Sequence, residues 1–256
     1  MGKNKKSAVD YDSSHEDDDI TKKNITVSFS GHVIQQNHTS GIYDLLVEKF
    51  PPDHIDLNLL VKEITKLGSF GTVLIELDDG KESFKNKLHE TNFFEDSEEI
   101  VFAVTAGIIV DMKDESNIIY KYLHKLSKKN SDVLKLLNSN KKFCMIFNER
   151  HEPDSLASIA PDMFNMLFND IKLYNKSNKD DPITDLLLLS SSSESKKNET
   201  IYLYSEDEII NQSAHFSSKC AKILQNYPDD LSLLCWKFDE NSRILNRIEE
   251  AHFNSL

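Results

Sequence analysis

Cysteine and histidine side chains could supply nucleophilic or metal chemistry in this chain, but their surroundings do not favour it. Cys144 is a candidate nucleophile, yet it lies in the apolar run FCMIF, where a thiol packs as a small inert group. His151-Glu152 begins like a zinc-binding HExxH helix. Ser155, however, stands where that motif needs its second histidine. We therefore expect no catalytic residue and no metal ligand from these motifs.

Glycine-rich loops that cradle phosphates are missing from the sequence as well. Gly80-Lys81 follows a predicted strand, but Ile75 and Glu82 replace the first glycine and the hydroxyl residue of a GxxxxGK loop. Gly68-Ser-Phe-Gly71 precedes a strand, whereas the serine-hydrolase elbow lies between a strand and a helix. The sequence therefore predicts no cofactor, and it does not support serine-hydrolase chemistry.

Cysteine usage and hydropathy indicate the compartment. Cys144, Cys220 and Cys235 are widely spaced and form no CxxC pair, which argues against a disulfide framework and favours a reducing environment. No run approaches the roughly 18 apolar residues of a membrane span. We expect a soluble intracellular protein that does not contact membranes.

The charge balance indicates the kind of partner. Among 256 residues, 43 acidic and 30 basic side chains give a net charge of −13, which repels nucleic acid and attracts basic partners. Only Arg150, Arg243 and Arg247 are arginines, so the planar forks that read guanine edges are scarce. We therefore expect a basic protein partner and no sequence-specific nucleic-acid binding.

Residues 1–23 carry many charges and hardly any large apolar group, which predicts a disordered tail. Within it, Asp17, Asp18 and Asp19 are candidate contacts for a basic partner, although such a run can also serve only for solubility. Ser13 and Ser14 each precede an acid by three residues, a spacing that suits acid-directed kinases.

Three further residues are candidate partner contacts. Glu149 and Arg150 follow the predicted strand 143–147, where such a pair can meet a partner or bond internally. Trp236 lies in the predicted strand 231–238, where it can form part of the core or an exposed aromatic rim.

Hydrophobic periodicity predicts a single α/β domain over residues 24–256, with a mixed central sheet flanked by helices. We expect charged residues up to about 99 to form an insertion after the second strand, and the serine-rich residues 190–199 to form a loop. The expected strands are 25–29 before a turn at Gly31, 72–77, 100–110, 143–147, 183–189, 201–204, 215–223 and 231–238. The expected helices are 39–50, 56–64, 161–171 and 239–253, together with a long helix from 119 that is continued or re-started over 133–137.

The segment from Phe143 to Ile171 resembles the hallmark of the BCCIP/Bcp family. In that family a buried strand ends in Ser/Asn-Glu-Arg, a proline-containing turn follows, and a helix opens with Ala-Pro. Here those elements are Asn148-Glu149-Arg150, Pro153 and Ala160-Pro161. The order of elements agrees over about residues 24–254.

The resemblance implies a fold like that of the GNAT acetyltransferases in a non-enzymatic nuclear protein, which shuttles to the cytoplasm. It implies a chaperone or escort role for a basic large-subunit ribosomal protein, in ribosome biogenesis and nuclear export. The alternatives are an adaptor for transport, DNA-repair or cell-cycle proteins, and a diverged acetyl-CoA-dependent acyltransferase. The chain lacks the Arg/Gln-x-x-Gly-x-Gly/Ala loop that acetyl-CoA binding requires, which disfavours the last alternative.

Overall fold

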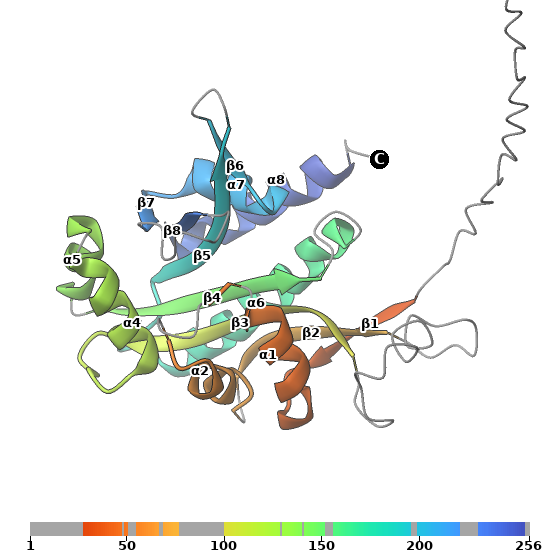
Figure 1. Ribbon diagram of the computed structural model, residues 1–256, viewed down its shortest axis with the longest axis horizontal. Coiled ribbons are helices and arrows are strands. Elements are labelled where there is room, and N and C mark those ends of the chain that lie inside the picture. Colours follow the sequence, from red (N-terminus) through yellow and green to blue (C-terminus); the bar gives the residue numbers. More distant parts are fainter. Residues whose placement is uncertain are drawn as a thin grey trace, which may run out of the picture.

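The computed structural model describes residues 28–47, 49–50, 55–66, 69–76, 100–128, 130–139, 141–151, 156–195, 199–220 and 230–253. In these residues an eight-stranded mixed sheet carries helices on both faces (Figure 1). The expected fold class, an α/β protein with a mixed central sheet, is therefore confirmed. The charged tail over 1–23, with Ser13 and Ser14, and the expected charged insertion lie outside the described residues.

The strand order is β1-β2-β3-β4-β5-β8-β7, and β6 pairs with β5 off this path. The β4–β5 pair is parallel and the other pairs are antiparallel. The strands are β1 Phe29–Val33, β2 Phe70–Glu76, β3 Val101–Asp111, β4 Lys142–Arg150, β5 Asp185–Glu194, β6 Thr200–Tyr202, β7 Phe216–Cys220 and β8 Asp230–Lys237.

Local signals explain where several helices begin. The Asp56 carboxylate accepts a hydrogen bond from the Leu59 amide and caps α2, Asn117 caps α4, and Pro161 lies in the first turn of α6. None of the described helices is long and apolar enough to span a bilayer. The helices are α1 Thr39–Val47, α2 Leu57–Ile64, α4 Ile118–Ser127, α5 Ser131–Leu137, α6 Ala160–Ser177, α7 Ser205–Ser213 and α8 Asn241–Phe253.

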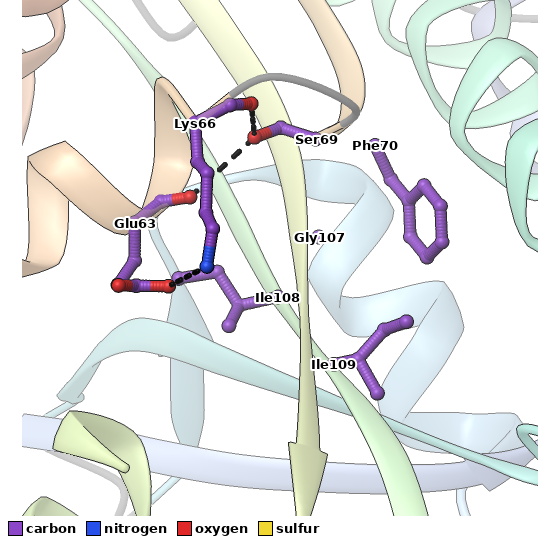
Figure 2. A pocket seen from close by; sticks show the side chains of 7 residues that line it. All are labelled: Glu63, Lys66, Ser69, Phe70, Gly107, Ile108 and Ile109. Atoms are coloured by element: carbon purple, nitrogen blue, oxygen red, sulfur yellow. Dashed lines mark hydrogen bonds and ion pairs between the residues drawn. The ribbon is translucent and has the colours of Figure 1, made fainter.

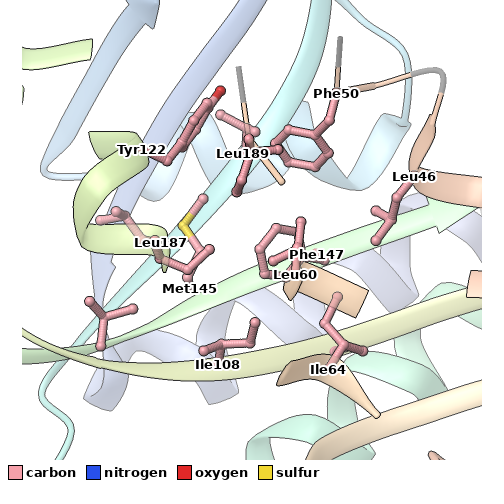
Figure 3. Packing of buried hydrophobic residues seen from close by; sticks show 14 of the residues in the cluster. Leu46, Phe50, Leu60, Ile64, Ile108, Tyr122, Met145, Phe147, Leu187 and Leu189 are labelled. Atoms are coloured by element: carbon pink, nitrogen blue, oxygen red, sulfur yellow. The ribbon is translucent and has the colours of Figure 1, made fainter. Parts of the chain in front are cut away.

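Strand β4 is buried on both faces, because its side chains alternate between two apolar layers. Phe143, Met145 and Phe147 pack in one layer with α1, α2, α4 and α5, and Figure 3 shows Phe147 and Met145 among side chains of that layer. Cys144 and Ile146 pack in the other layer with α6 and α8. Burial raises the pKa of the Cys144 thiol, so this cysteine is a packing group and not a nucleophile.

The start of β2 leaves part of β3 without a partner strand on that side. Phe70 lies opposite Gly107, so Ile108 and Ile109 extend past the end of β2, and a hollow of about 250 Å³ lies beside them (Figure 2). Gly71 has φ +110°, and a Cβ there would lie 2.0 Å from the carbonyl oxygen of Thr105. This entry into the sheet therefore requires glycine.

The structure corrects three expectations about the elements. Strand β1 continues through Gly31, which pairs with Leu74, so no turn occurs there. Strand β5 continues to Glu194 through the serines expected to form a loop, because their hydroxyls find partners inside the protein, as Ser190 does with Asp207. Helix α7 has no counterpart in the expected elements.

Candidate functional site

The parallel strands β4 and β5 pair only at their beginnings. Phe143–Ile146 pairs with Asp185–Leu188, after which the two strands diverge (Figure 1). In open α/β sheets, ligands bind outside the carboxyl ends of parallel strands. The opening between Asn148–Arg150 of β4 and Ser190–Ser192 of β5, here called the β4–β5 wedge, is therefore the candidate site.

The chain fills this wedge with its own residues. Strand β6 pairs with the end of β5, with Tyr202 opposite Ser192, and the Leu203 amide donates to the carbonyl of Ser191 at 2.9 Å. Helix α7 follows at once, and its first turn places Glu206 and Asp207, each 1% exposed, inside the protein. The wedge is thus occupied by acidic side chains.

Two ion pairs lie on opposite faces of β4. Lys49, just after α1, donates to Glu149 on one face. On the other face, Nη1 and Nη2 of Arg150 donate to Oε1 and Oε2 of Glu206 at 2.6 and 3.1 Å. Such a bidentate pair fixes the geometry of both side chains. Together the two pairs connect α1 and α7 through the end of one strand.

Tyr204 joins the two ion pairs. Its hydroxyl donates to Oε2 of Glu149 at 3.2 Å and accepts from the Arg150 amide at 3.2 Å. Its ring lies 4.3 Å from the guanidinium carbon of Arg150, a cation–π contact. Burial, and then the Glu149 carboxylate, raise the pKa of Tyr204. The phenol therefore stays protonated and acts as a hydrogen-bond donor.

Asn148 extends the network toward β3. Its Nδ2 donates to Oε1 of Glu206 at 2.9 Å, and its Oδ1 accepts from the Thr105 hydroxyl at 2.8 Å. Both the donor and the acceptor of this buried amide are therefore satisfied, as the interior of a protein requires.

Asp207 differs from the other acids in the wedge. Its Oδ2 accepts from the Ser190 hydroxyl at 2.5 Å, while Oδ1 has no hydrogen-bond partner among the described residues. Burial and the neighbouring Glu206 raise the pKa of Asp207 to about 8. At neutral pH this carboxyl is therefore largely protonated, which lowers the cost of placing it here.

The charges inside the wedge balance. With Asp207 neutral, the cations Lys49 and Arg150 face the carboxylates of Glu149 and Glu206. Burial raises the pKa of Glu149, and the Lys49 ammonium opposes that shift. Because these cations and carboxylates bond to one another, the two pairs connect the end of β4 to Lys49 and to α7, and their charges are engaged inside the protein.

The hollow beside β3 is a second location to consider. Its volume of about 250 Å³ is below the roughly 300–1,000 Å³ of small-molecule sites. Its polar residues bond to one another, since Ser69 donates to the carbonyl of Lys66 and Lys66 pairs with Glu63 at 3.7 Å (Figure 2). The Ser69 hydroxyl bonds to the backbone carbonyls of Glu63 and Lys66 and not to their side chains.

Burial decides between the two alternatives for the candidate contacts Glu149, Arg150 and Trp236, and it favours the internal one. They are 6%, 8% and 0% exposed. Glu149 and Arg150 bond internally, and the Trp236 indole donates to Oδ1 of Asn241 at 2.7 Å. The candidates Asp17, Asp18 and Asp19 lie outside the described residues.

Four ionisable members of the network, Lys49, Tyr204, Glu206 and Asp207, are not among the residues expected from the sequence. Glu206 and Asp207 carry a weak signal, because the run Ser205-Glu-Asp-Glu is typical of a helix N-terminus. Lys49 and Tyr204 carry none, because their partner Glu149 lies 100 and 55 positions away along the chain.

Comparisons with known proteins agree with this architecture. The family model BCCIP matches residues 24–219. The crystal structure of BCP1 from Saccharomyces cerevisiae is similar, with a TM-score of 0.58, 17% identity, and coverage of 92% of this chain and 93% of that chain. This likeness supports the fold.

Two acetyltransferase structures are more distant. An N-acetyltransferase from Staphylococcus aureus Mu50 has a TM-score of 0.38, with 11% identity and coverage of 83% and 99% of the two chains. NAA60 from Arabidopsis thaliana, in complex with a bisubstrate analogue, has 0.41, with 10% identity and coverage of 82% and 99%. At these scores neither structure bears on the chemistry of this chain. No curated protein matches the chain.

Proposed function

The chain belongs to the BCCIP family, and from that premise we propose that it is a non-catalytic factor that escorts a basic protein of the large ribosomal subunit. The proposal that the chain is non-catalytic rests on one observation, namely that the chain's own residues fill the β4–β5 wedge. Where the fold would leave room for a ligand, Arg150 and Glu206 pair with each other, and Tyr204 and Asn148 bond to them.

The charge of the chain supports a basic protein as the partner. The net charge is −13, so long-range attraction favours cationic surfaces. The guanidinium groups are engaged within the protein: Arg150 by Glu206, Arg243 by Glu240 at 3.2 Å, and Arg247 by Ser213 at 2.9 Å. This favours a protein partner over nucleic acid, for which unengaged arginine forks are the usual contacts.

Strand β6 offers an apolar contact next to acidic groups. Ile201 and Leu203 are 53% and 42% exposed and, two residues apart, lie on one side of the chain. Glu199 and Glu208, which are near them in the sequence, are also exposed. In the described residues β6 pairs with β5 alone. We include this β6 patch in the proposal as a contact for an extended basic segment that carries apolar side chains.

The first experiment identifies the client. The tagged full chain is purified from its own cells at moderate salt, and the bound proteins are identified by mass spectrometry. We expect one stoichiometric basic protein of the large subunit, without the rest of the ribosome. Transport, repair or cell-cycle proteins in its place would refute the ribosomal client and favour the adaptor alternative.

The second experiment tests the contact with purified components. Affinity for the captured client should fall at least about tenfold between low and high salt, because charge steers the encounter. The double variant Ile201→Ser with Leu203→Ser should weaken binding. The matched control Leu173→Ser, at a 59% exposed leucine on α6, should not. Equal effects of both variants would exclude the β6 patch.

Two further measurements test catalysis and location. Saturating acetyl-CoA should leave the melting temperature unchanged, whereas a specific ligand raises it through binding to the folded state. A reproducible rise in the melting temperature would favour the acyltransferase alternative.

The proposal also places the chain in the nucleus with passage to the cytoplasm, and imaging of the tagged chain in its own cells tests that location.

A further inference from the structure

Three potential metal ligands meet at the end of the sheet opposite the β4–β5 wedge. Asp185 begins β5, His215 precedes β7, and Cys235 lies in β8. One ligand atom from each lies within 4.8 Å of the other two. These residues are far apart in the sequence and form no motif, so only the pairing of the strands brings them together.

The backbone holds these three residues in place. Cys235 lies opposite Leu187 of β5 and Phe216 of β7, and the His215 amide donates to the carbonyl of Cys235 at 3.0 Å. Asp185 and Cys235 therefore stand on paired strands, and His215 is bonded to β8 directly before β7 begins, so the backbone positions of the three ligands are fixed while their side chains can rotate.

Asp185 already has one oxygen oriented by the protein. The Thr184 hydroxyl donates to Oδ2 at 2.7 Å, and Oδ1 lies 3.7 Å from Nε2 of His215. An outer hydrogen bond of this kind orients a carboxylate ligand in metal sites.

We propose that Asp185, His215 and Cys235 bind a divalent ion of the zinc type, with water as the fourth ligand. Carboxylate oxygen, imidazole nitrogen and thiolate sulfur are the donors that zinc takes. In a tetrahedral zinc site such donors stand about 3.3–3.7 Å apart. The ligand atoms now lie within 4.8 Å of one another, so the side chains must rotate to bring them about 1 Å closer when the ion binds. When the ion binds, the Cys235 thiol releases its proton to solvent.

Exposure leaves a path for the ion. The His215 side chain is 46% exposed, so both the ion and its water can enter from that side. Lys237 competes for the same carboxylate, since its Nζ lies 2.5 Å from Oδ1 of Asp185. The Lys237 side chain is 44% exposed and can turn to solvent when the ion arrives.

The test uses the full chain, treated with a chelator and titrated with Co²⁺, whose bond to thiolate gives a near-ultraviolet charge-transfer band. We expect one ion per chain, displaced by Zn²⁺. Cys235→Ala should abolish the band, whereas the matched controls Cys144→Ala and Cys220→Ala should keep it. His215→Ala, at an exposed position, should weaken affinity by more than the roughly 10–100-fold that an outer-shell change costs.

Two other variants probe the geometry. Thr184→Val should weaken binding roughly 10–100-fold by freeing the Asp185 carboxylate, and Lys237→Ala should tighten it by removing the competing ammonium. The absence of a band in the wild type would overturn the proposal. So would a band that survives Cys235→Ala, or an affinity unchanged by His215→Ala, because the ion would then bind elsewhere.

Discussion

The two ends of the β4–β5 pair are held together by different interactions. At the paired end, Phe143–Ile146 and Asp185–Leu188 share a parallel backbone ladder, and Ile146 and Leu188 are fully buried in one apolar layer. At the diverging end, helix α7 bridges the two strands instead: Glu206 pairs with Arg150 of β4, and Asp207 accepts a hydrogen bond from Ser190 of β5. Where strands separate, their backbone groups need other hydrogen-bond partners and the space between them must be filled. This chain fills the space with buried cations and an equal number of carboxylates.

The rim of the paired end also carries an ion pair, but one of its side chains is partly exposed to solvent. Asp185 bonds to Lys237, whose side chain is 44% exposed. Burial acts to raise the pKa of Asp185, but the hydrogen bonds from Lys237 and Thr184 outweigh it and hold the pKa below its usual value. The Asp185–Lys237 pair should therefore contribute less to the free energy of unfolding than the Arg150–Glu206 pair, because water reaches Lys237 and not Arg150.

The largest effect is expected in the wedge. Arg150→Ala should lower the free energy of unfolding by about 3–5 kcal/mol, because it leaves the Glu206 carboxylate buried without its cation. Urea denaturation followed by circular dichroism measures this. The control is Arg150→Met with Glu206→Gln, which removes both charges and keeps an acceptor for Asn148. It should recover most of the loss, and equal losses in the two proteins would mean that the charges do not act as a pair.

Asp207 should make the wedge sensitive to pH. Its folded pKa of about 8 exceeds the unfolded value of about 3.9. The protonated Asp207 carboxyl therefore contributes fully to the free energy of unfolding below about pH 4, and this contribution is lost as the pH rises toward 8. Compared with Asp207→Asn, which resembles the protonated acid, the wild type should lose up to about 1.4 kcal/mol per pH unit in that window.

Denaturation of both proteins at pH 5, 6, 7 and 8 measures this difference. Glu149 and the other titrating groups are present in both proteins, so the difference between the two curves reports the Asp207 carboxyl together with its interactions with the neighbouring charges. Parallel curves would show that Asp207 has an ordinary pKa in the folded protein.

A packing change at the paired end should have a smaller effect. Ile146→Val removes one methyl group from a fully buried site and should cost about 0.5–1.5 kcal/mol, with no dependence on pH. The midpoint of urea unfolding at pH 5 and pH 8 measures both properties. A cost that changed with pH would show that the apolar layer and the wedge are coupled.

The smallest effect is expected at the rim of the paired end. Lys237→Ala should cost about 1 kcal/mol, because the Lys237 ammonium is partly exposed to water and the buried Asp185 keeps its hydrogen bond from the Thr184 hydroxyl. The loss should shrink further in 0.5 M salt, whereas the loss from Arg150→Ala should persist. A cost for Lys237→Ala equal to that of Arg150→Ala would remove the distinction between the two ends.

The elements near the centre of the sheet were predictable because their side chains alternate or run continuously apolar. Strand β3 and the first part of β4 follow such runs, and α2 follows its capping residue Asp56. The extension of β5 through Ser190 was not predictable. A serine run favours a loop by composition, and only the partner Asp207 makes a buried hydroxyl acceptable there.

The candidate site could be predicted only in part. Its β4 segment, Asn148-Glu149-Arg150, is visible as the end of a buried strand and as a match to a family pattern. Its other side is helix α7, whose short and acidic sequence does not distinguish a buried element from a solvated one. The burial of Glu149 and Arg150 follows from α7 and from Lys49, and so it could not be inferred from β4 alone.

The sequence by itself determined the class of fold, the net charge of −13 and the absence of phosphate-binding and hydrolase motifs, since these depend on composition and on short-range spacing. Only the tertiary structure decided which charged residues are buried. It also decided that Asp185, His215 and Cys235 meet. Both depend on strands distant in the sequence becoming neighbours, and the free energy of a buried charge depends on the groups that such neighbours place around it.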